Sequence, residues 1–112
     1  MARDKLYLIE PGFSDAERPG QRFVCPSCNR VEGLLRSFPE LAAQLDVERV
    51  AFPRPRRQVI AEIGEDSQSL PVLILSGDAP ADLPVANGKR FASDIERILA
   101  LLSDRHGFPR QH

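Results

Sequence analysis

Residues 25–38 read CPSCNRVEGLLRSF, in which two cysteines stand at the start of a segment with helical periodicity. The apolar side chains of this segment recur at spacings of three and four residues and so line one face of a helix, namely Val31, Leu34, Leu35 and Phe38. Pro26 fits the first turn, where its missing N–H costs nothing. The stretch therefore predicts a helix that begins at Pro26, with Cys25 at about the N-cap and Cys28 at the third helical position.

Apolar segments on both sides of this helix predict strands. Residues 5–10 form the first strand, which ends at a Pro-Gly pair, and residues 47–52 form the second, which ends at a Pro-Arg-Pro sequence. The segment 11–24 contains two prolines and two glycines among polar side chains. We therefore expect an extended loop there, ending at Cys25.

Capping and terminating residues predict where the next helices begin and end. Ser37 and Glu40 form a capping box, so we expect the first helix to break near Ser37 and to restart through Leu45. A second helix is expected to begin at Pro55. It ends at Gly64, which can take the left-handed C-cap conformation.

The second half of the chain predicts two more strands. Residues 70–75 are apolar at every position, as expected of a central strand that is covered on both faces. The Asn87-Gly88 pair is a strong hairpin signal and predicts an edge strand at 89–92. The loop before this pair is expected to contain one extra arm, at 83–86.

A final helix completes the predicted fold. A capping box of Ser93 and Glu96 opens it, and Gly107 closes it. The element order is then β-α-β-α-β-β-α, which resembles that of a thioredoxin fold and so implies an α/β protein with a four-stranded mixed sheet and helices on both faces. A chain of 112 residues, of which 42% are hydrophobic, fits a single domain over residues 1–112.

The composition excludes several classes of function. Fifteen Lys and Arg against sixteen Asp and Glu give a formal net charge of -1, which leaves no strong field to attract nucleic acid or anionic lipid. The apolar runs are far shorter than the roughly 18 residues of a membrane span, and the first residues lack the long apolar region of a signal peptide. We expect a cytoplasmic protein that binds neither nucleic acid nor membranes; the sequence leaves its oligomeric state open.

The two cysteines are the candidate reactive residues. At an N-cap, the Cys25 sulfur faces unsatisfied backbone N–H groups and the positive end of the helix dipole, and both favour a thiolate. Two intervening residues bring Cys28 within reach of a mixed disulfide formed at Cys25. Cys25 is therefore the candidate attacking thiolate, and Cys28 is the candidate resolving thiol.

Two other interpretations of the cysteine pair stay open. One is that both cysteines are small buried hydrophobic residues without chemistry. The other is a zinc or iron–sulfur site shared by two chains, because His106 and His112 stand at the C-terminal end but not at zinc-finger spacing. We predict no metal site within the single chain.

Part of the chain resembles the glutaredoxin branch of the thioredoxin superfamily. The resemblance rests on the element order and on three motifs, Cys25-Pro26-Ser27-Cys28, Ser69-Leu70-Pro71 and Ser93-Asp94. It implies that the peptide bond of Pro71 is cis and that Pro71 packs beside the cysteines. The backbone of Leu70 would then be free to pair with a bound peptide or glutathione, and Pro26 would also contact the substrate.

The same resemblance implies where glutathione would bind. Arg22 stands where glutaredoxins carry a basic residue for the glycine carboxylate, and a guanidinium suits that ligand. Ser93 and Asp94 match the place where the family holds the γ-glutamyl end. The alternatives are that Ser93 only caps the last helix, that Asp94 only complements its dipole and that Arg22 is a solvated loop residue.

Over almost its whole length the chain is similar to a bacterial thioredoxin-like family of unknown function, in the segments 11–13, 25–28, 32–33 and 106–109. The predicted function is thiol–disulfide exchange on a protein or low-molecular-weight disulfide, with glutathione as a co-substrate and no tightly bound cofactor. Two alternatives stay open. One is a redox-inactive binding or adaptor module with the same fold, and the other is a glutathione-binding, transferase-like protein.

Two further features are unusual for their positions. Arg54, Arg56 and Arg57 form a dense basic run at a helix start, where the helix dipole disfavours cations. We expect a solvated face there, with an acidic partner or a bound anion as the alternative. Gly33 lies inside a helix at a cost of roughly 1 kcal/mol relative to Ala, so we expect close packing against it.

Overall fold

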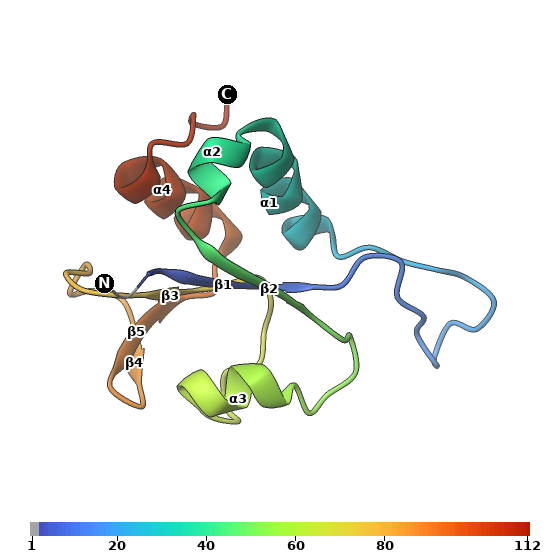
Figure 1. The fold of residues 1–112 in the computed structure, drawn as a ribbon. Coiled ribbons are helices and arrows are strands. Elements are labelled where there is room, and N and C mark those ends of the chain that lie inside the picture. Colours follow the sequence, from blue (N-terminus) through green and yellow to red (C-terminus); the bar gives the residue numbers. More distant parts are fainter. Residues whose placement is uncertain (1–2) are drawn as a thin grey trace.

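A five-stranded mixed sheet forms the centre of the computed structural model, which describes residues 3–112 (Figure 1). The strands lie side by side in the order β2-β1-β3-β5-β4. Their bounds are Lys5–Ile9 (β1), Asp46–Val50 (β2), Val72–Leu75 (β3), Val85–Ala86 (β4) and Lys89–Ala92 (β5). β1 and β2 pair in parallel, whereas β3 runs antiparallel to both β1 and β5. The predicted α/β class and mixed sheet are confirmed.

The number of strands differs from the four that were predicted. The extra strand is β4, which pairs antiparallel with β5 at the edge of the sheet. The turn between them is Asn87-Gly88, with φ angles of 51° and 75°. These are the left-handed values that a two-residue hairpin turn requires. The predicted hairpin is therefore confirmed, and the arm expected at 83–86 is a two-residue strand.

Four helices cover the sheet on both faces, as predicted. α1, α2 and α4 lie on one face, and α3 lies on the other (Figure 1). Their bounds are Pro26–Ser37 (α1), Pro39–Ala42 (α2), Arg57–Ile63 (α3) and Ile95–His106 (α4). Neither of the two predicted capping boxes forms.

A carboxylate rather than a hydroxyl caps the last helix. Asp94, not Ser93, is the N-cap of α4, and its carboxylate accepts a hydrogen bond from the Arg97 N–H at 2.9 Å. A charged acceptor is favoured at the positive end of the helix dipole. At the other predicted box, α1 ends at Ser37, and Phe38 leads into α2 without a side-chain cap.

Two helices are also shorter than predicted. α2 ends before Leu45, and α3 begins at Arg57 rather than at Pro55. The intervening Arg56 has φ −96° and ψ 86°, which is not helical, and its backbone N–H donates to Gln68 Oε1 at 2.8 Å. Arg56 is the N-cap because its backbone is not helical while its carbonyl accepts the first hydrogen bonds of the helix, from the Val59 and Ile60 N–H groups, so the helix begins one residue after it.

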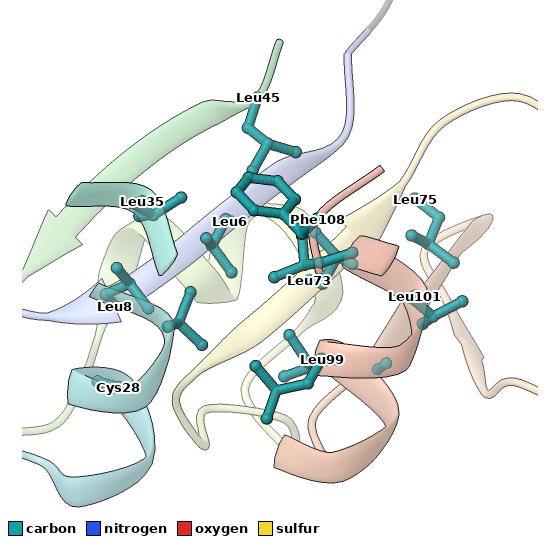
Figure 2. Packing of buried hydrophobic residues seen from close by; sticks show 14 of the residues in the cluster. Leu6, Leu8, Cys28, Leu35, Leu45, Leu73, Leu75, Leu99, Leu101 and Phe108 are labelled. Carbon is teal, nitrogen blue, oxygen red and sulfur yellow. The ribbon is translucent and has the colours of Figure 1, made fainter. Parts of the chain in front are cut away.

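Alternate residues of β1 enter two different cores. Leu6 and Leu8 belong to the larger core, between the sheet and helices α1 and α4, where Figure 2 shows them with Leu35 and Cys28. Tyr7 belongs to the smaller core on the α3 side of the sheet. The alternation follows from the two-residue period of a strand. Cys28 is thus part of the packed core, and packing fixes its position.

Gly33 does not pack closely against any other element, so that prediction is wrong. It lies on the exposed side of α1, and a Cβ atom built on it would meet nothing within 4 Å. The helix therefore has room for a side chain at this position. Nothing in the structure explains the glycine.

A buried carboxylate ties the end of α4 to the sheet. Asp4 is 2% exposed, accepts hydrogen bonds from Arg105 Nε at 2.7 Å and from the Ser76 N–H at 2.9 Å, and lies 2.8 Å from His106 Nε2. Burial raises the pKa of Asp4, but the hydrogen bonds of Arg105, Ser76 and His106 together outweigh burial and lower the pKa to about 2. The folded protein therefore favours the ionised carboxylate.

This cluster makes the stability depend on pH in the acid range. The pKa of Asp4 is about 2 in the folded protein, against an ordinary value of 3.8. Its contribution is therefore complete above pH 4 and is lost as the pH falls through 4 towards 2. We expect a loss of about 2 kcal/mol in the free energy of unfolding from this group. Urea denaturation at successive pH values measures it.

The Asp4→Asn variant is the test of this assignment. It should be less stable at pH 7 and should show a flatter dependence of stability on pH below 4. Asp104→Asn is the matched control, because Asp104 is 56% exposed and its ion pair with Arg110 is a surface pair. An acid profile of Asp4→Asn that equals the wild-type profile would contradict the assignment.

Candidate active site

Cys25 stands at the N-cap of α1, as predicted. Its φ and ψ angles of −74° and 119° are extended, and its Sγ accepts a hydrogen bond from the Cys28 N–H at 3.2 Å. Because α1 begins at Pro26, Cys28 is the third helical residue. The Cys25 side chain is partly exposed, and both cysteines are free thiols. The sulfur of Cys25 thus lies at the positive end of the helix and within reach of a molecule from solvent.

Cys28 occupies the opposite environment. It is 2% exposed, and its sulfur accepts a hydrogen bond from the Ile9 N–H of β1 at 3.4 Å. Burial, followed by the hydrogen bond with the Cys25 sulfur, raises the pKa of Cys28 to about 12, although the Ile9 N–H acts against this change. At neutral pH Cys28 is therefore a protonated thiol, held beside the Cys25 sulfur.

A cavity of about 400 Å³ opens beside Cys25. Its wall is mainly apolar and comes from the end of β1, the two ends of the 11–24 loop, the start of α1 and the segment after β2. The apolar lining residues are Ile9, Phe13, Phe23, Val24, Pro26 and Phe52. Asp15 and Arg18 of the loop add one charge of each sign. Cys25 and Pro26 therefore line the same small, mainly apolar cavity, and the predicted contact of Pro26 with a substrate stays a prediction.

The extended loop predicted at 11–24 builds one wall of this cavity. Phe13 and Phe23 form an antiparallel bridge at its base, with Phe23 N–H donating to the Phe13 carbonyl at 2.8 Å. The Phe13 ring also stacks on Phe52 with centroids 4.3 Å apart. Beyond this base the loop extends away from the sheet (Figure 1). Aromatic residues on two distant segments therefore meet at the cavity, which their positions in the sequence did not indicate.

Arg22 helps to close the base of the same loop. Its Nε donates to the Gly12 carbonyl at 3.0 Å, and its guanidinium lies against the Gly12 backbone. Gly12 has φ 79°, a left-handed value that favours glycine. Arg22 is exposed and does not line the cavity beside Cys25. The structure thus gives it a role in the loop, and its predicted contact with glutathione stays a prediction.

The other predicted substrate-binding residues lie at the start of β3 and of α4. The Leu70–Pro71 peptide bond is cis, as the resemblance implies; Pro71 is buried and Leu70 is partly buried against both cores. Ser93 lines a separate hollow of about 120 Å³ with Ser69. Asp94 caps α4. None of these four predicted residues lines the cavity beside Cys25.

Arg56 is buried, so the solvated face predicted for the basic run is wrong at this residue. It is 6% exposed, whereas Arg54 and Arg57 are exposed. Its Nε and Nη2 donate to the Phe52 carbonyl at 3.0 and 2.6 Å, and its Nη1 donates to the Gln68 carbonyl at 2.8 Å. The fork of a guanidinium satisfies two backbone carbonyls that no helix or strand pairs, and this explains its burial.

Within residues 3–112, no three or more His, Cys, Asp or Glu side chains are grouped so that they could hold a metal ion. In the same part of the chain, no helix is long and apolar enough to cross a membrane. His106, considered above as a ligand, contacts Asp4 instead.

The two cysteines should differ sharply in reactivity. In the folded, reduced protein at neutral pH, we expect iodoacetamide to modify Cys25 and to leave Cys28 unmodified, because Cys28 is buried and its pKa is about 12. Peptide mass spectrometry after a timed reaction measures both. In urea the two should react at similar rates, which is the control. Faster modification of Cys28 than of Cys25 in the folded protein would contradict this geometry.

The comparisons with known proteins place the chain in a family but bring no relative of known function. No curated protein and no solved structure matches it. One family model matches residues 3–110, nearly the whole chain, and its description is "Protein of unknown function (DUF3088)". The match includes the cysteine pair, every strand and every helix described above. The chain belongs to this family, DUF3088.

Proposed function

We propose that the protein is a thiol–disulfide oxidoreductase in which Cys25 attacks the substrate and Cys28 resolves the intermediate. One observation carries the proposal, which is the difference between the two adjacent sulfurs. Cys25 is partly exposed at a helix N-terminus, beside a cavity, and Cys28 is buried as a protonated thiol. An attacking thiolate needs access and a positive environment, whereas a resolving thiol needs protection until the mixed disulfide forms.

The proposed reaction has two exchanges. The Cys25 thiolate attacks one sulfur of a substrate disulfide, an S–S bond forms between enzyme and substrate, and the other substrate sulfur leaves as a thiolate that takes up a proton. Cys28 then loses its proton and attacks the Cys25 sulfur, which releases the second substrate thiol. The substrate disulfide gains two electrons and two protons, and the Cys25–Cys28 dithiol becomes a disulfide. A second thiol must then reduce the enzyme.

We also propose that the fold is thioredoxin-like, with β4 as an additional edge strand. The support is the arrangement of β2, β1 and β3, in which a parallel pair is joined to an antiparallel strand, and the position of the cysteines at the start of the helix after β1. Pro71 at the entrance to β3 adds to it. On this proposal the Leu70 backbone and the apolar cavity receive the substrate chain.

Single cysteine variants test the proposed roles. We expect Cys25→Ser to lose all turnover of a disulfide-bonded peptide in the presence of dithiothreitol, because no attacking sulfur remains. Cys28→Ser should form a mixed disulfide with the same peptide and keep it, because no second sulfur can release it. Intact-mass spectrometry detects this adduct. Turnover in Cys25→Ser, or no adduct in Cys28→Ser, would overturn the assignment.

Glutathione as co-substrate is a narrower proposal with its own test. Calorimetry with reduced glutathione should show binding to the reduced protein, and Arg22→Ala and Ser93→Ala should weaken it if these residues hold the two ends of the tripeptide. Arg36→Ala, an exposed arginine at the end of α1, is the control for Arg22→Ala. Absence of binding would exclude glutathione and would leave disulfide exchange with other thiols in place.

A further inference from the structure

The buried guanidinium of Arg56 lies behind the wall of the cavity at Cys25. Two of its nitrogens donate to the Phe52 carbonyl, and its Cζ lies 5.7 Å from the centre of the Phe52 ring. That ring lines the cavity together with Cys25 and stacks on Phe13. Arg56 is therefore connected to the proposed reaction site through a single residue.

The charge of Arg56 has no carboxylate beside it. In the part of the chain that the structure describes, all hydrogen bonds of its guanidinium go to neutral backbone carbonyls, and it forms no ion pair. Burial, followed by the nearby charge of Arg54, lowers the pKa of Arg56, and the Cys28 and Cys25 sulfurs oppose this change when they are ionised. A buried charge requires compensation. Among the groups that act on Arg56, the cysteine sulfurs are the ones that can carry the opposite charge.

We infer that Arg56 is a positioning residue for the proposed dithiol, and that its buried positive charge stabilises the Cys25 thiolate. This inference rests on the proposed function, because it assigns a charge partner to the attacking sulfur. Cys28 is buried and protonated, so the sulfur that is free to carry the negative charge is Cys25. Reduction of the dithiol then places an anion near Arg56, and oxidation removes it.

Other charges also face this site, and they do not replace Arg56. The 11–24 loop contributes Asp15 and Arg18 to the cavity, and these have opposite signs. On α1, Glu32 raises the pKa of Cys28, but it forms a bidentate ion pair with Arg49. Arg56 is the charged residue in this group that is less than a tenth exposed, and a buried charge is less screened by solvent.

The first test compares three variants of the arginine run. Arg56→Met removes the charge at similar length, and we expect the rate of Cys25 alkylation by iodoacetamide at pH 7 to fall roughly tenfold. Arg56→Lys keeps the charge and should retain most of the wild-type rate. Arg57→Met is the matched control, because it removes an exposed charge from the next residue. Equal rates in folded Arg56→Met and Arg57→Met would overturn the inference.

The second test compares the stabilities of two chemical adducts of Cys25. Iodoacetamide leaves a neutral carbamidomethyl group on the Cys25 sulfur, whereas iodoacetate leaves a carboxymethyl group of similar size with a negative charge; iodide leaves in both reactions. The helix N-terminus also favours an anion at Cys25, so we expect the carboxymethyl protein to have the higher Tm in the wild type and a smaller advantage in Arg56→Met. Equal Tm values for the two adducts, or an equal advantage in Arg56→Met, would overturn the inference.

The outcomes of these two tests are independent of the outcome of the test of the proposed function. Neither the alkylation rate nor the stability of the adducts depends on disulfide exchange. A charge effect of Arg56 without a trapped mixed disulfide would contradict oxidoreductase activity alone. A trapped mixed disulfide without a charge effect would contradict the role of Arg56 alone.

Discussion

The hydrogen bond from the Cys28 N–H to the Cys25 sulfur determines how this site is built. It makes Cys25 the N-cap of α1, so the sulfur lies at the helix N-terminus, and it brings the two sulfurs together. A second hydrogen bond, from the Ile9 N–H to the Cys28 sulfur, attaches the first turn of α1 to the end of β1. Because Cys28 also packs in the larger core, the cysteine pair is held by the same contacts that hold the fold.

Three segments that are far apart in the sequence meet around Cys25. The end of β1 supplies Ile9, the base of the 11–24 loop supplies Phe13, and the segment after β2 supplies Phe52 with Arg56 behind it. The two faces of the sheet therefore contribute different groups to the surroundings of Cys25. The α1 face holds the sulfurs, and the chain that crosses towards α3 brings the buried charge.

Sequence patterns over a few neighbouring residues predicted the position of the cysteines, but they did not predict which distant residues pack around them. The helix start at Cys25 and the hairpin at Asn87-Gly88 depend on neighbouring residues, and both are confirmed. The burial of Arg56 depends on the Gln68 carbonyl, 12 residues further along the chain, and no local pattern shows such a contact. Asp94 rather than Ser93 is the N-cap of α4, because a charged carboxylate is the stronger hydrogen-bond acceptor. A tertiary contact therefore decided the burial of Arg56, and local hydrogen bonding decided the cap of α4.

The redox equilibrium of the cysteine pair shows directly whether Cys25 and Cys28 exchange disulfides. The wild-type protein would be equilibrated in a series of glutathione redox buffers, quenched with acid and weighed intact by mass spectrometry. We expect one reversible two-electron transition, from the dithiol to a Cys25–Cys28 disulfide that has lost two hydrogen atoms. A pair that stays reduced in the most oxidising buffer, or that ends as a stable glutathione adduct without the internal disulfide, would contradict it.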